Sequence, residues 1–261
     1  MSRRSISGSR AIVTGASSGI GQALARELNR QGVRLVLSAR REDRLSQLAS
    51  ELSGTGTEAT YCVGDVTRAE VRTAILETAQ NSFGGLDLLV NNAGVGALGP
   101  FAEADEARLR RVMEVNFFAP AELMRSAIPL LTHGNRPMIV DISSVLGHRA
   151  VPNKSEYCAS KFALHGLSDA VRAELAESGI DLLLVSPSTT KSEFFDNVLE
   201  SRAPQPALGA GPMSPEQVAC KTVRAIRRGR HEIILSPGGK LLVWLDRISP
   251  PLINRLVARF G

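Results

Sequence analysis

Six short apolar runs, separated by longer segments of helical periodicity, constrain the fold of this chain more than any other feature. Most of the runs are nearly continuous in apolar character, which is typical of strands buried on both faces of a parallel sheet. The runs are Ala11–Thr14, Val33–Ser38, Asp87–Val90, Met138–Ile142, Ile180–Ser186 and Glu232–Leu235. Between them apolar residues recur at three-to-four spacing, as in Ile20, Leu24 and Leu28, which predicts helices packed on the sheet. The alternation predicts a doubly wound α/β fold with a parallel sheet of about seven strands and helices on both faces.

Composition narrows the class of protein. The chain has 261 residues, of which 43% are hydrophobic and 22% charged, and this excludes disorder, collagen and coiled coil. We find no Pro/Gly-rich linker and no internal repeat, so residues 1–261 are expected to form a single domain. The longest apolar runs, such as Leu241–Leu245, are far shorter than the roughly 20 residues that span a bilayer, and no secretory signal follows the N-terminal arm. The protein is therefore expected to be cytoplasmic.

The cysteines and histidines of the chain are not spaced as they are in known kinds of metal site. They are Cys62, Cys158, Cys220, His133, His148, His165 and His231. The cysteines are odd in number and widely separated, so neither a disulfide framework nor a zinc site is indicated. The histidines form no metal pair in the sequence, and metal-dependent chemistry is not predicted.

The positive charge of the chain is concentrated at one end. Residues 1–220 carry 22 Lys+Arg and 24 Asp+Glu, a balance of −2, whereas residues 221–261 carry 9 and 2, a balance of +7. A nucleic-acid partner is not expected, because such a partner would require a basic face on the main body of the fold.

A glycine-rich turn, Thr14–Gly21, joins the first predicted strand to the first helix. Backbone N–H groups in such a turn approach a pyrophosphate, while the helix N-terminus adds partial positive charge. The predicted cofactor contacts are Gly15, Ser17, Ser18, Gly19, Ile20 and Gly21. The spacing is GxxxGxG rather than GxGxxG, and a tight strand-to-helix turn without a ligand is the alternative interpretation.

The end of the second strand bears on cofactor choice. An acidic residue there would bind the ribose 2′-hydroxyl of NAD, whereas an arginine suits the 2′-phosphate of NADP. This sequence has Arg40 and Arg41 and no acidic residue at that place, so NADP(H) is favoured over NAD(H). Alternatively, both arginines are solvated at the start of the next helix.

Together these motifs and others further along resemble the short-chain dehydrogenase/reductase family, over almost the whole length up to about Leu235. The matching pieces, in order, are Thr14–Gly21, Asp65–Val66, Asn91–Gly94, Asn116, Ser143–Ser144, Tyr157–Lys161 and Ser186–Pro187. The resemblance implies a Rossmann-type fold, an NAD(P)-dependent oxidoreductase and a homodimer or homotetramer.

Tyr157 and Lys161 stand four residues apart, so on a helix they share one face. A nearby ammonium favours phenolate, and we expect it to lower the pKa of Tyr157 from its usual value of about 10. Tyr157 is the predicted general acid for reduction and base for oxidation. The resemblance implies that Lys161 also binds the nicotinamide ribose, and both Tyr157 and Lys161 are predicted cofactor contacts.

Two further side chains complete the predicted catalytic set. Ser144 follows the strand Met138–Ile142, at the carboxyl edge where open α/β sheets bind ligands, and its hydroxyl is suited to bind a substrate oxygen. The resemblance favours it over Ser143. It also implies that Asn116 holds a water linking Lys161 to solvent, with a local helix distortion as the alternative role.

The remaining cofactor contacts are implied by the resemblance. Asp65 and Val66 would flank the adenine, and Asn92–Gly94, including Ala93, would pass the adenosine ribose. Pro187, Thr190 and Ser192 would meet the nicotinamide carboxamide, although Ser188 replaces the usual glycine after Pro187.

Two C-terminal segments are expected to shape substrate choice. The resemblance implies that residues 193–213 form a substrate lid, and their apolar content suggests a hydrophobic substrate body. The basic amphipathic tail 240–261 either packs on the pocket or against another subunit, or makes a peripheral membrane contact.

We therefore expect an NADP(H)-dependent oxidoreductase that transfers hydride between nicotinamide and a small-molecule carbonyl or alcohol substrate. The alternative is an NADP(H)-sensing regulatory protein or membrane-attached scaffold without turnover, because a fold alone does not determine function.

Overall fold

The strands of this chain form one large and one small parallel sheet. The computed structural model describes residues 4–54, 56–191, 199–201 and 211–260. The strands are β1 (Arg10–Thr14), β2 (Arg34–Ala39), β3 (Ala59–Val63), β4 (Leu88–Asn91), β5 (Ala97–Leu98), β6 (Met138–Ile142), β7 (Asp181–Ser186), β8 (Leu199–Ser201) and β9 (Glu232–Ile234). Seven of them pair in the order β3-β2-β1-β4-β6-β7-β9, and β5 pairs with β8. The doubly wound parallel fold predicted from the sequence is confirmed.

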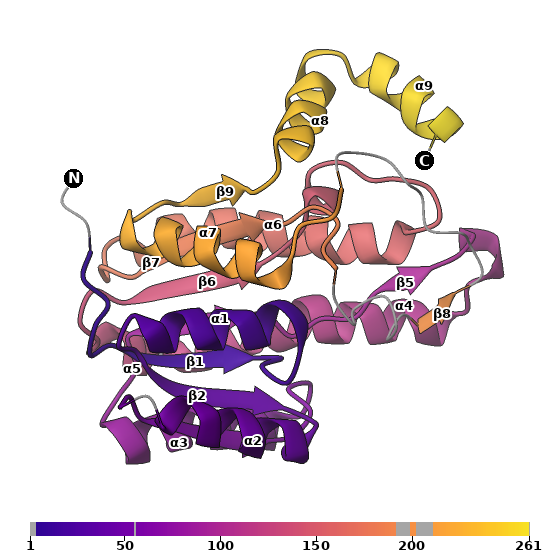
Figure 1. The fold of residues 1–261 in the computed structure, drawn as a ribbon. Helices are drawn as coiled ribbons and strands as arrows, with labels where there is room; N and C mark the ends of the chain where they lie inside the picture. Colours follow the sequence, from indigo (N-terminus) through magenta and orange to yellow (C-terminus); the bar gives the residue numbers. More distant parts are fainter. Residues whose placement is uncertain (1–3, 55, 192–198, 202–210, 261) are drawn as a thin grey trace.

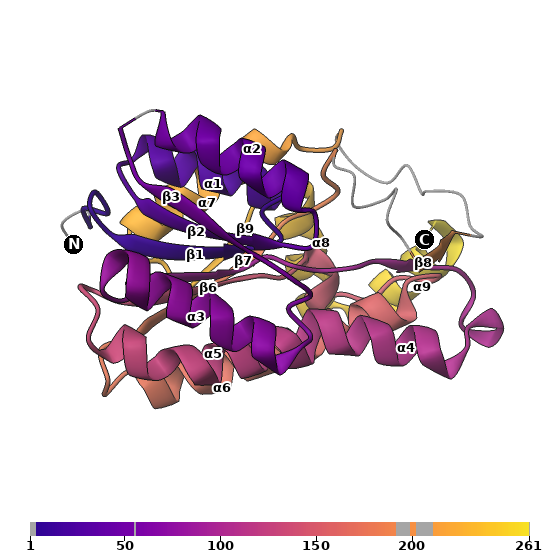
Figure 2. The same cartoon turned by 90° about the horizontal axis from the view of Figure 1, so that it is seen from below.

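Helices cover both faces of the large sheet (Figures 1 and 2). The helices are α1 (Gly19–Arg30), α2 (Glu42–Ser53), α3 (Ala69–Phe83), α4 (Glu106–Met113), α5 (Ala119–Thr132), α6 (Ser155–Leu175), α7 (Pro215–Arg227), α8 (Pro237–Ile248) and α9 (Pro250–Phe260), with shorter turns η1 (Phe101–Glu103), η2 (Glu114–Phe118) and η3 (Val145–Gly147). Figure 2 shows α1, α2 and α7 on one face and α3, α5 and α6 on the other.

Alternation along the strands divides the core into two layers. In β1, Ala11 and Val13 belong to the cluster beneath α1, α2 and α7, whereas Ile12 belongs to the cluster beneath α3, α5 and α6. Each strand is therefore buried on both faces, which explains its almost continuous apolar character.

The six apolar runs correspond to β1, β2, β4, β6, β7 and β9, each within one residue at either end. The strand of the large sheet that is missing from those runs is β3, at the edge of the sheet, whose residues are only half-buried or exposed. An edge strand needs less apolar sequence than a central one, which is why it was not found by its hydrophobicity.

The chain reverses its direction across the sheet between β1 and β4. Strands β2 and β3 are added on one side of β1, and β4, β6, β7 and β9 on the other. Such a reversal opens a crevice at the carboxyl ends of the strands, where ligands bind in open α/β sheets. Helices α8 and α9 project beyond the body of the sheet (Figure 1). Among the described residues, no helix combines the length and apolar character needed to cross a membrane.

Candidate active site

A cavity of about 820 Å³ occupies the carboxyl edge of the large sheet and reaches α8 and α9. It brings together most of the residues singled out in the sequence. Those that line it are Gly15, Ser17, Ser18, Gly19, Ile20, Arg40, Arg41, Asp65, Val66, Asn92, Ala93, Gly94, Ser144, Tyr157, Lys161, Pro187 and Thr190. Gly21 and Asn116 lie behind this surface, and Ser192 lies outside the described residues, as does most of the segment 193–213.

The glycine-rich turn is held in shape by its neighbours. Gly15 has a φ of +65° and Gly19 a φ of +54°, backbone conformations that favour glycine. A Cβ on Gly21 would collide with the Gly15 carbonyl and the Asn92 amide. Asn92 Nδ2 donates to the carbonyl oxygen of Thr14 at 2.9 Å, so this side chain braces the turn.

The start of α1 is suited to an anion. Ser18 is its N-cap residue and makes no side-chain capping bond within the described structure, so the first amide groups of the helix are available to a ligand. Gly19 and Ile20 in that first turn line the cavity. The turn therefore fits a pyrophosphate, because small residues leave the backbone accessible where the helix dipole is positive.

Arg40 and Arg41 both line the cavity at the end of β2. The Arg41 guanidinium lies beside the glycine-rich turn, where its Nε and one terminal nitrogen contact Ser17 Oγ at 3.2 and 3.1 Å. A guanidinium in this position presents several donors to an anion next to a ribose.

Tyr157 lies on α6 facing Ser144, which caps the η3 turn. Burial raises the pKa of Tyr157 to about 12, and a hydrogen bond with Ser144 opposes that rise. The pKa of Tyr157 is thus raised, whereas the sequence led us to expect that Lys161 would lower it. Lys161 Nζ lies 5.8 Å from the centre of the Tyr157 ring. The ammonium instead donates to the Ile142 carbonyl at 2.9 Å.

Lys161 is itself buried beside a carboxyl group. Burial lowers the pKa of Lys161 to about 8, and the charge of Asp141 opposes that lowering. Asp141, in β6, has a raised pKa because it is fully buried, although it accepts hydrogen bonds from Asn91 (2.9 Å) and Ser168 (2.8 Å). A lysine with this pKa exchanges protons near neutral pH.

Asn116 lies in η2, a π-helical turn between α4 and α5. Its side chain accepts from Val95 N and donates to Val95 O, both at 2.9 Å, and Nδ2 also donates to Ser160 Oγ at 3.0 Å. A Cβ on Gly94 would come within 3.2 Å of Asn116 Oδ1 and 3.9 Å of Lys161 Nζ. Asn116 Oδ1 and Lys161 Nζ thus both lie next to Gly94. The helix distortion that was the alternative role for Asn116 is also present, as the π-helical turn η2. Such single π-turns are frequent at functional sites.

Asp65 is fixed at the far end of the cavity by a contact that sequence reasoning missed. Arg111, from α4, lies 3.0 Å from Asp65 Oδ2 and also lines the cavity. Nothing in the spacing of the two residues along the chain connects them, since the fold alone brings α4 beside the segment that follows β3.

The segment after β7 returns toward η3. Val145 N donates to the Pro187 carbonyl at 2.9 Å, and Thr190 Oγ1 donates to the Ser188 carbonyl at 3.1 Å. Pro187 therefore lies beside the segment that carries Ser144, and Thr190 lines the same cavity.

Comparison with known proteins shows which family has this fold and this cavity. A family model described as short chain dehydrogenase matches residues 9–203. A ketoacyl reductase, HetN, from Nostoc sp. is 30% identical over 98% of this chain and 90% of its own length. Dehydrogenase/reductase SDR family member 7B from Bos taurus is 30% identical over 95% of this chain and 79% of its own length.

Solved structures show the same architecture. A short chain dehydrogenase/reductase from Burkholderia phymatum in complex with NAD superposes with a TM-score of 0.87, 27% identity, and coverage of 95% of this chain and 96% of that one. A short chain dehydrogenase from Burkholderia cenocepacia in complex with NADP gives a TM-score of 0.80, 25% identity, and coverage of 91% and 100%. With its parallel sheet, its phosphate-binding turn and these matches, the chain belongs to the short-chain dehydrogenase/reductase family of oxidoreductases and is built to use a nicotinamide cofactor.

Proposed function

We propose that this oxidoreductase transfers hydride between NADP(H) and a carbonyl or alcohol carbon of a hydrophobic small molecule. The observation that carries the proposal is the meeting of Ser144, Tyr157 and Lys161 on one wall of the cavity, beyond the glycine-rich turn. We further propose that residues 1–261 form one NAD(P)-binding domain, and that residues 193–213, most of which lie outside the described residues, serve as its substrate lid.

The catalytic roles follow from the contacts of these side chains. When bound, the nicotinamide supplies the hydride in reduction or accepts it in oxidation. Ser144 donates a hydrogen bond to the substrate oxygen and orients Tyr157, which gives its phenolic proton to that oxygen in reduction. Lys161 stabilises the resulting phenolate, because its ammonium lies 5.8 Å from the centre of the Tyr157 ring. Asn116, which adjoins Lys161 across Gly94, holds the water through which the proton is replaced.

The preference for NADP(H) rests on Arg40 and Arg41. Both line the cavity at the end of β2, and the Arg41 guanidinium is already oriented by Ser17. A 2′-phosphate there would form hydrogen bonds in which donor and acceptor are both charged, whereas the 2′-hydroxyl of NAD offers the guanidinium no negative charge.

A hydrophobic substrate body is supported by the end of the cavity under the C-terminal helices. The lining residues contributed by α8 and α9 include Leu241, Leu242, Leu245, Ile253, Leu256 and Val257. All are apolar, so the tail 240–261 serves partly as a wall of the substrate site.

The proposal is tested by following oxidation of NADPH and of NADH with ketones and aldehydes of increasing alkyl length. We expect turnover with NADPH, weaker turnover with NADH, and a KM that falls as the apolar part lengthens. NADPH binding without turnover on any substrate would favour the sensor alternative, which has no support in the arrangement of Ser144, Tyr157 and Lys161.

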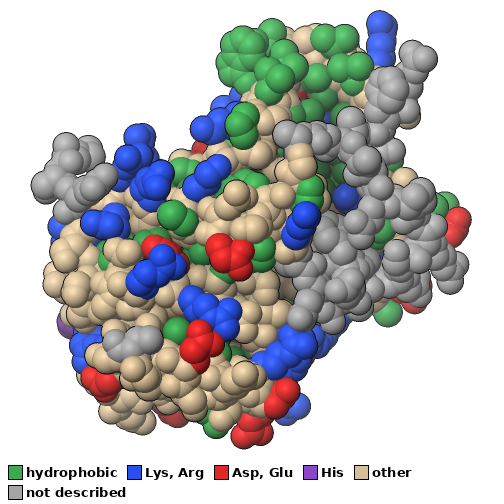
Figure 3. All heavy atoms as spheres, in the orientation of Figure 1, with side chains coloured by type: hydrophobic (Ala, Val, Ile, Leu, Met, Phe, Trp, Pro, Cys, Tyr) green, Lys and Arg blue, Asp and Glu red, His purple; other side chains and the backbone are tan. Residues whose placement is uncertain are grey.

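The tail also supports a second proposal, peripheral contact with an anionic membrane. Hydrophobic side chains gather over α8 and α9 in Figure 3, and Leu241, Trp244, Ile248, Leu252 and Leu256 are exposed. The excess positive charge of residues 221–261 suits an acidic surface. A homodimer or homotetramer remains a prediction.

A further inference from the structure

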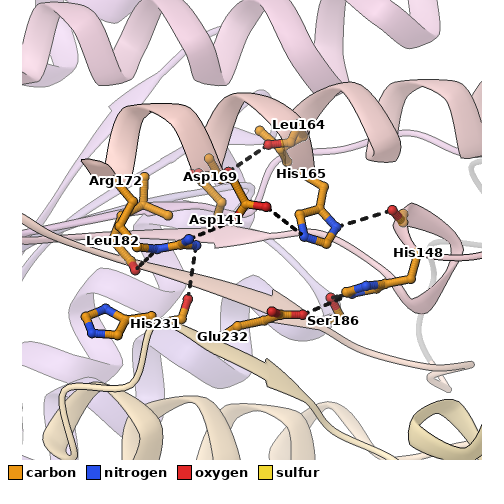
Figure 4. A network of polar contacts seen from close by, with 12 residues as sticks. Asp141, His148, Leu164, His165, Asp169, Arg172, Leu182, Ser186, His231 and Glu232 are labelled. Carbon is orange, nitrogen blue, oxygen red and sulfur yellow. Dashed lines mark hydrogen bonds and ion pairs between the residues drawn. The ribbon is translucent and has the colours of Figure 1, made fainter. Parts of the chain in front are cut away.

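Outside the cofactor cavity, two of the four histidines meet in a second hollow of about 290 Å³. His148 follows the η3 turn, His165 lies on α6, and Glu232 begins β9 (Figure 4). One ligand atom from each of these three side chains lies within 4.8 Å of the other two. Their positions in the sequence gave no sign of this cluster, because the packing of α6 against β7 and β9 creates it.

The distances are close to those of a metal site. His148 Nε2 lies 3.5 Å from Glu232 Oε1, and the centres of the two histidine rings are 4.4 Å apart. Ligand atoms on a tetrahedral zinc ion, at about 2.0–2.2 Å from the metal, lie about 3.4 Å from one another. The His148–Glu232 pair already has this separation, and the ligand atom of His165 lies within 4.8 Å of both.

His148 is the most buried side chain of the cluster, with only 3% of its side chain exposed. An ion bound through this ring would therefore be shielded from solvent on that side.

The ring of His165 is oriented from outside the cluster. Its Nδ1 lies 3.3 Å from the Gly147 carbonyl, which leaves Nε2 as the nitrogen for a metal. Metal-binding histidines commonly donate their other N–H to a carbonyl in this way. Asp169 Oδ2 lies 3.5 Å from His165 Nε2, and its other oxygen contacts Arg172 at 2.7 Å, so Asp169 lies beside the cluster and is not one of its three ligands.

We propose that His148, His165 and Glu232 form a binding site for a divalent transition-metal ion, with zinc as the best match to two imidazoles and a carboxylate. This donor set selects against magnesium and calcium, which prefer oxygen ligands only.

Such an ion would brace the segments that carry the candidate active site. His148 comes four residues after Ser144, and His165 comes four after Lys161. His148 Nε2 lies 2.9 Å from the hydroxyl of Ser186, the residue before Pro187, and an ion bound through this nitrogen would replace that contact. An ion between these segments therefore stabilises their packing against β9 without entering the cavity, and this role does not depend on the proposed reaction.

The test is a zinc titration of the full chain against a chromophoric chelator at neutral pH under reducing conditions. Because Cys220 is exposed, Cys220→Ser serves as the background for every protein. We expect one tight equivalent, a zinc-dependent rise in Tm, and binding weaker by about 10–100-fold or more in His148→Gln and His165→Gln.

His231→Gln is the matched control, because His231 precedes Glu232 and its ring lies apart from the cluster in Figure 4. It should bind zinc as the parent protein does. Glu232→Gln provides a second test at a side chain that is 36% exposed, a position where loss of folding is not expected. The proposal would be overturned if the parent protein bound no tight equivalent of zinc. It would also be overturned if His231→Gln lost as much zinc affinity as His148→Gln and His165→Gln.

Discussion

At the scale of single residues, the buried charge of Lys161 lowers the stability of the folded protein. Its pKa is lowered to about 8 because burial disfavours the ammonium form. Below pH 8 the side chain is charged in both the folded and the unfolded state, and only the folded state bears the desolvation. As pH rises from about 8 to 10.5, the folded state loses the proton first, so stability rises.

We predict that Lys161→Met abolishes turnover yet raises the free energy of unfolding of the cofactor-free protein at pH 7 by about 1–3 kcal/mol. The advantage over the parent protein should shrink toward pH 10, since the lysine is by then neutral in the folded state. Urea unfolding of both proteins at several pH values measures this. Equal or lower stability of the variant at pH 7 would show that the contacts of Lys161 with Ile142 and Asp141 outweigh its desolvation.

A second prediction concerns Arg41. Arg41→Ala should raise the Kd for NADPH by about 10–100-fold and leave that for NADH within about twofold, because only the 2′-phosphate needs the guanidinium. Fluorescence titration with both cofactors measures the two constants. Arg44→Ala is the control, since Arg44 is on α2 and is not part of the cavity wall. An equal rise in the Kd values of NADPH and NADH would argue against recognition of the 2′-phosphate by Arg41.

Local sequence predicts some of these residues and not others. Tyr157 and Lys161 were predictable because their spacing on a helix places them on one face. The direction of the Tyr157 pKa shift was not, since it depends on burial and on where the Lys161 ammonium is directed. Arg111 and the His148–His165 pair were missed for the same reason: their contacts join segments far apart in the chain.

At the scale of elements, α6 is held to α4 by a buried ion pair. Arg108 donates to Glu156 Oε1 from Nε at 3.0 Å and from a terminal nitrogen at 2.6 Å, and both side chains are at most 5% exposed. Burial alone would raise the pKa of Glu156, yet the hydrogen bonds from Arg108 lower it. Because Glu156 immediately precedes Tyr157, this pair helps to set the position of the tyrosine.

We predict that Arg108→Met destabilises the protein by about 3–5 kcal/mol, because it leaves a buried carboxylate without its partner. The double variant Arg108→Met with Glu156→Gln should recover much of this loss, since no charge then remains buried. Chemical unfolding of the three proteins measures both effects. A double variant no more stable than Arg108→Met would show that the loss arises from packing.

Most elements could be predicted from hydrophobic pattern, and the exceptions have physical reasons. Central strands such as β6, which is apolar except for the buried Asp141, were found with correct bounds. The edge strand β3 is half exposed, and the two-residue strand β5 is too short to carry a pattern. The π-turn at Asn116 has no signature in hydrophobic periodicity, because it adds a single residue to an otherwise continuous helix.

At the scale of the whole molecule, α8 and α9 give it an exposed apolar surface next to the cavity. Trp244, the only tryptophan of the chain, is 62% exposed there. Exposed apolar groups beside cationic residues are typical of helices that lie in a membrane interface.

We predict that anionic phospholipid vesicles shift the emission of Trp244 to shorter wavelength at low salt, because the indole moves into the interface. Neutral phosphatidylcholine vesicles should cause a smaller shift, and high salt should reverse the anionic effect. Unchanged emission with anionic vesicles at low salt would contradict membrane contact and favour a subunit interface on this surface.

The central claim, that Tyr157 exchanges the proton in hydride transfer, is tested most directly by Tyr157→Phe beside Tyr61→Phe. These are the only two tyrosines of the chain, and Tyr61 lies in the edge strand β3. Single-turnover oxidation of bound NADPH by the best carbonyl substrate should slow by about 100–10,000-fold in Tyr157→Phe, with NADPH affinity unchanged. Tyr61→Phe should react like the parent protein. A Tyr157→Phe protein that reacts at the parent rate would contradict the account.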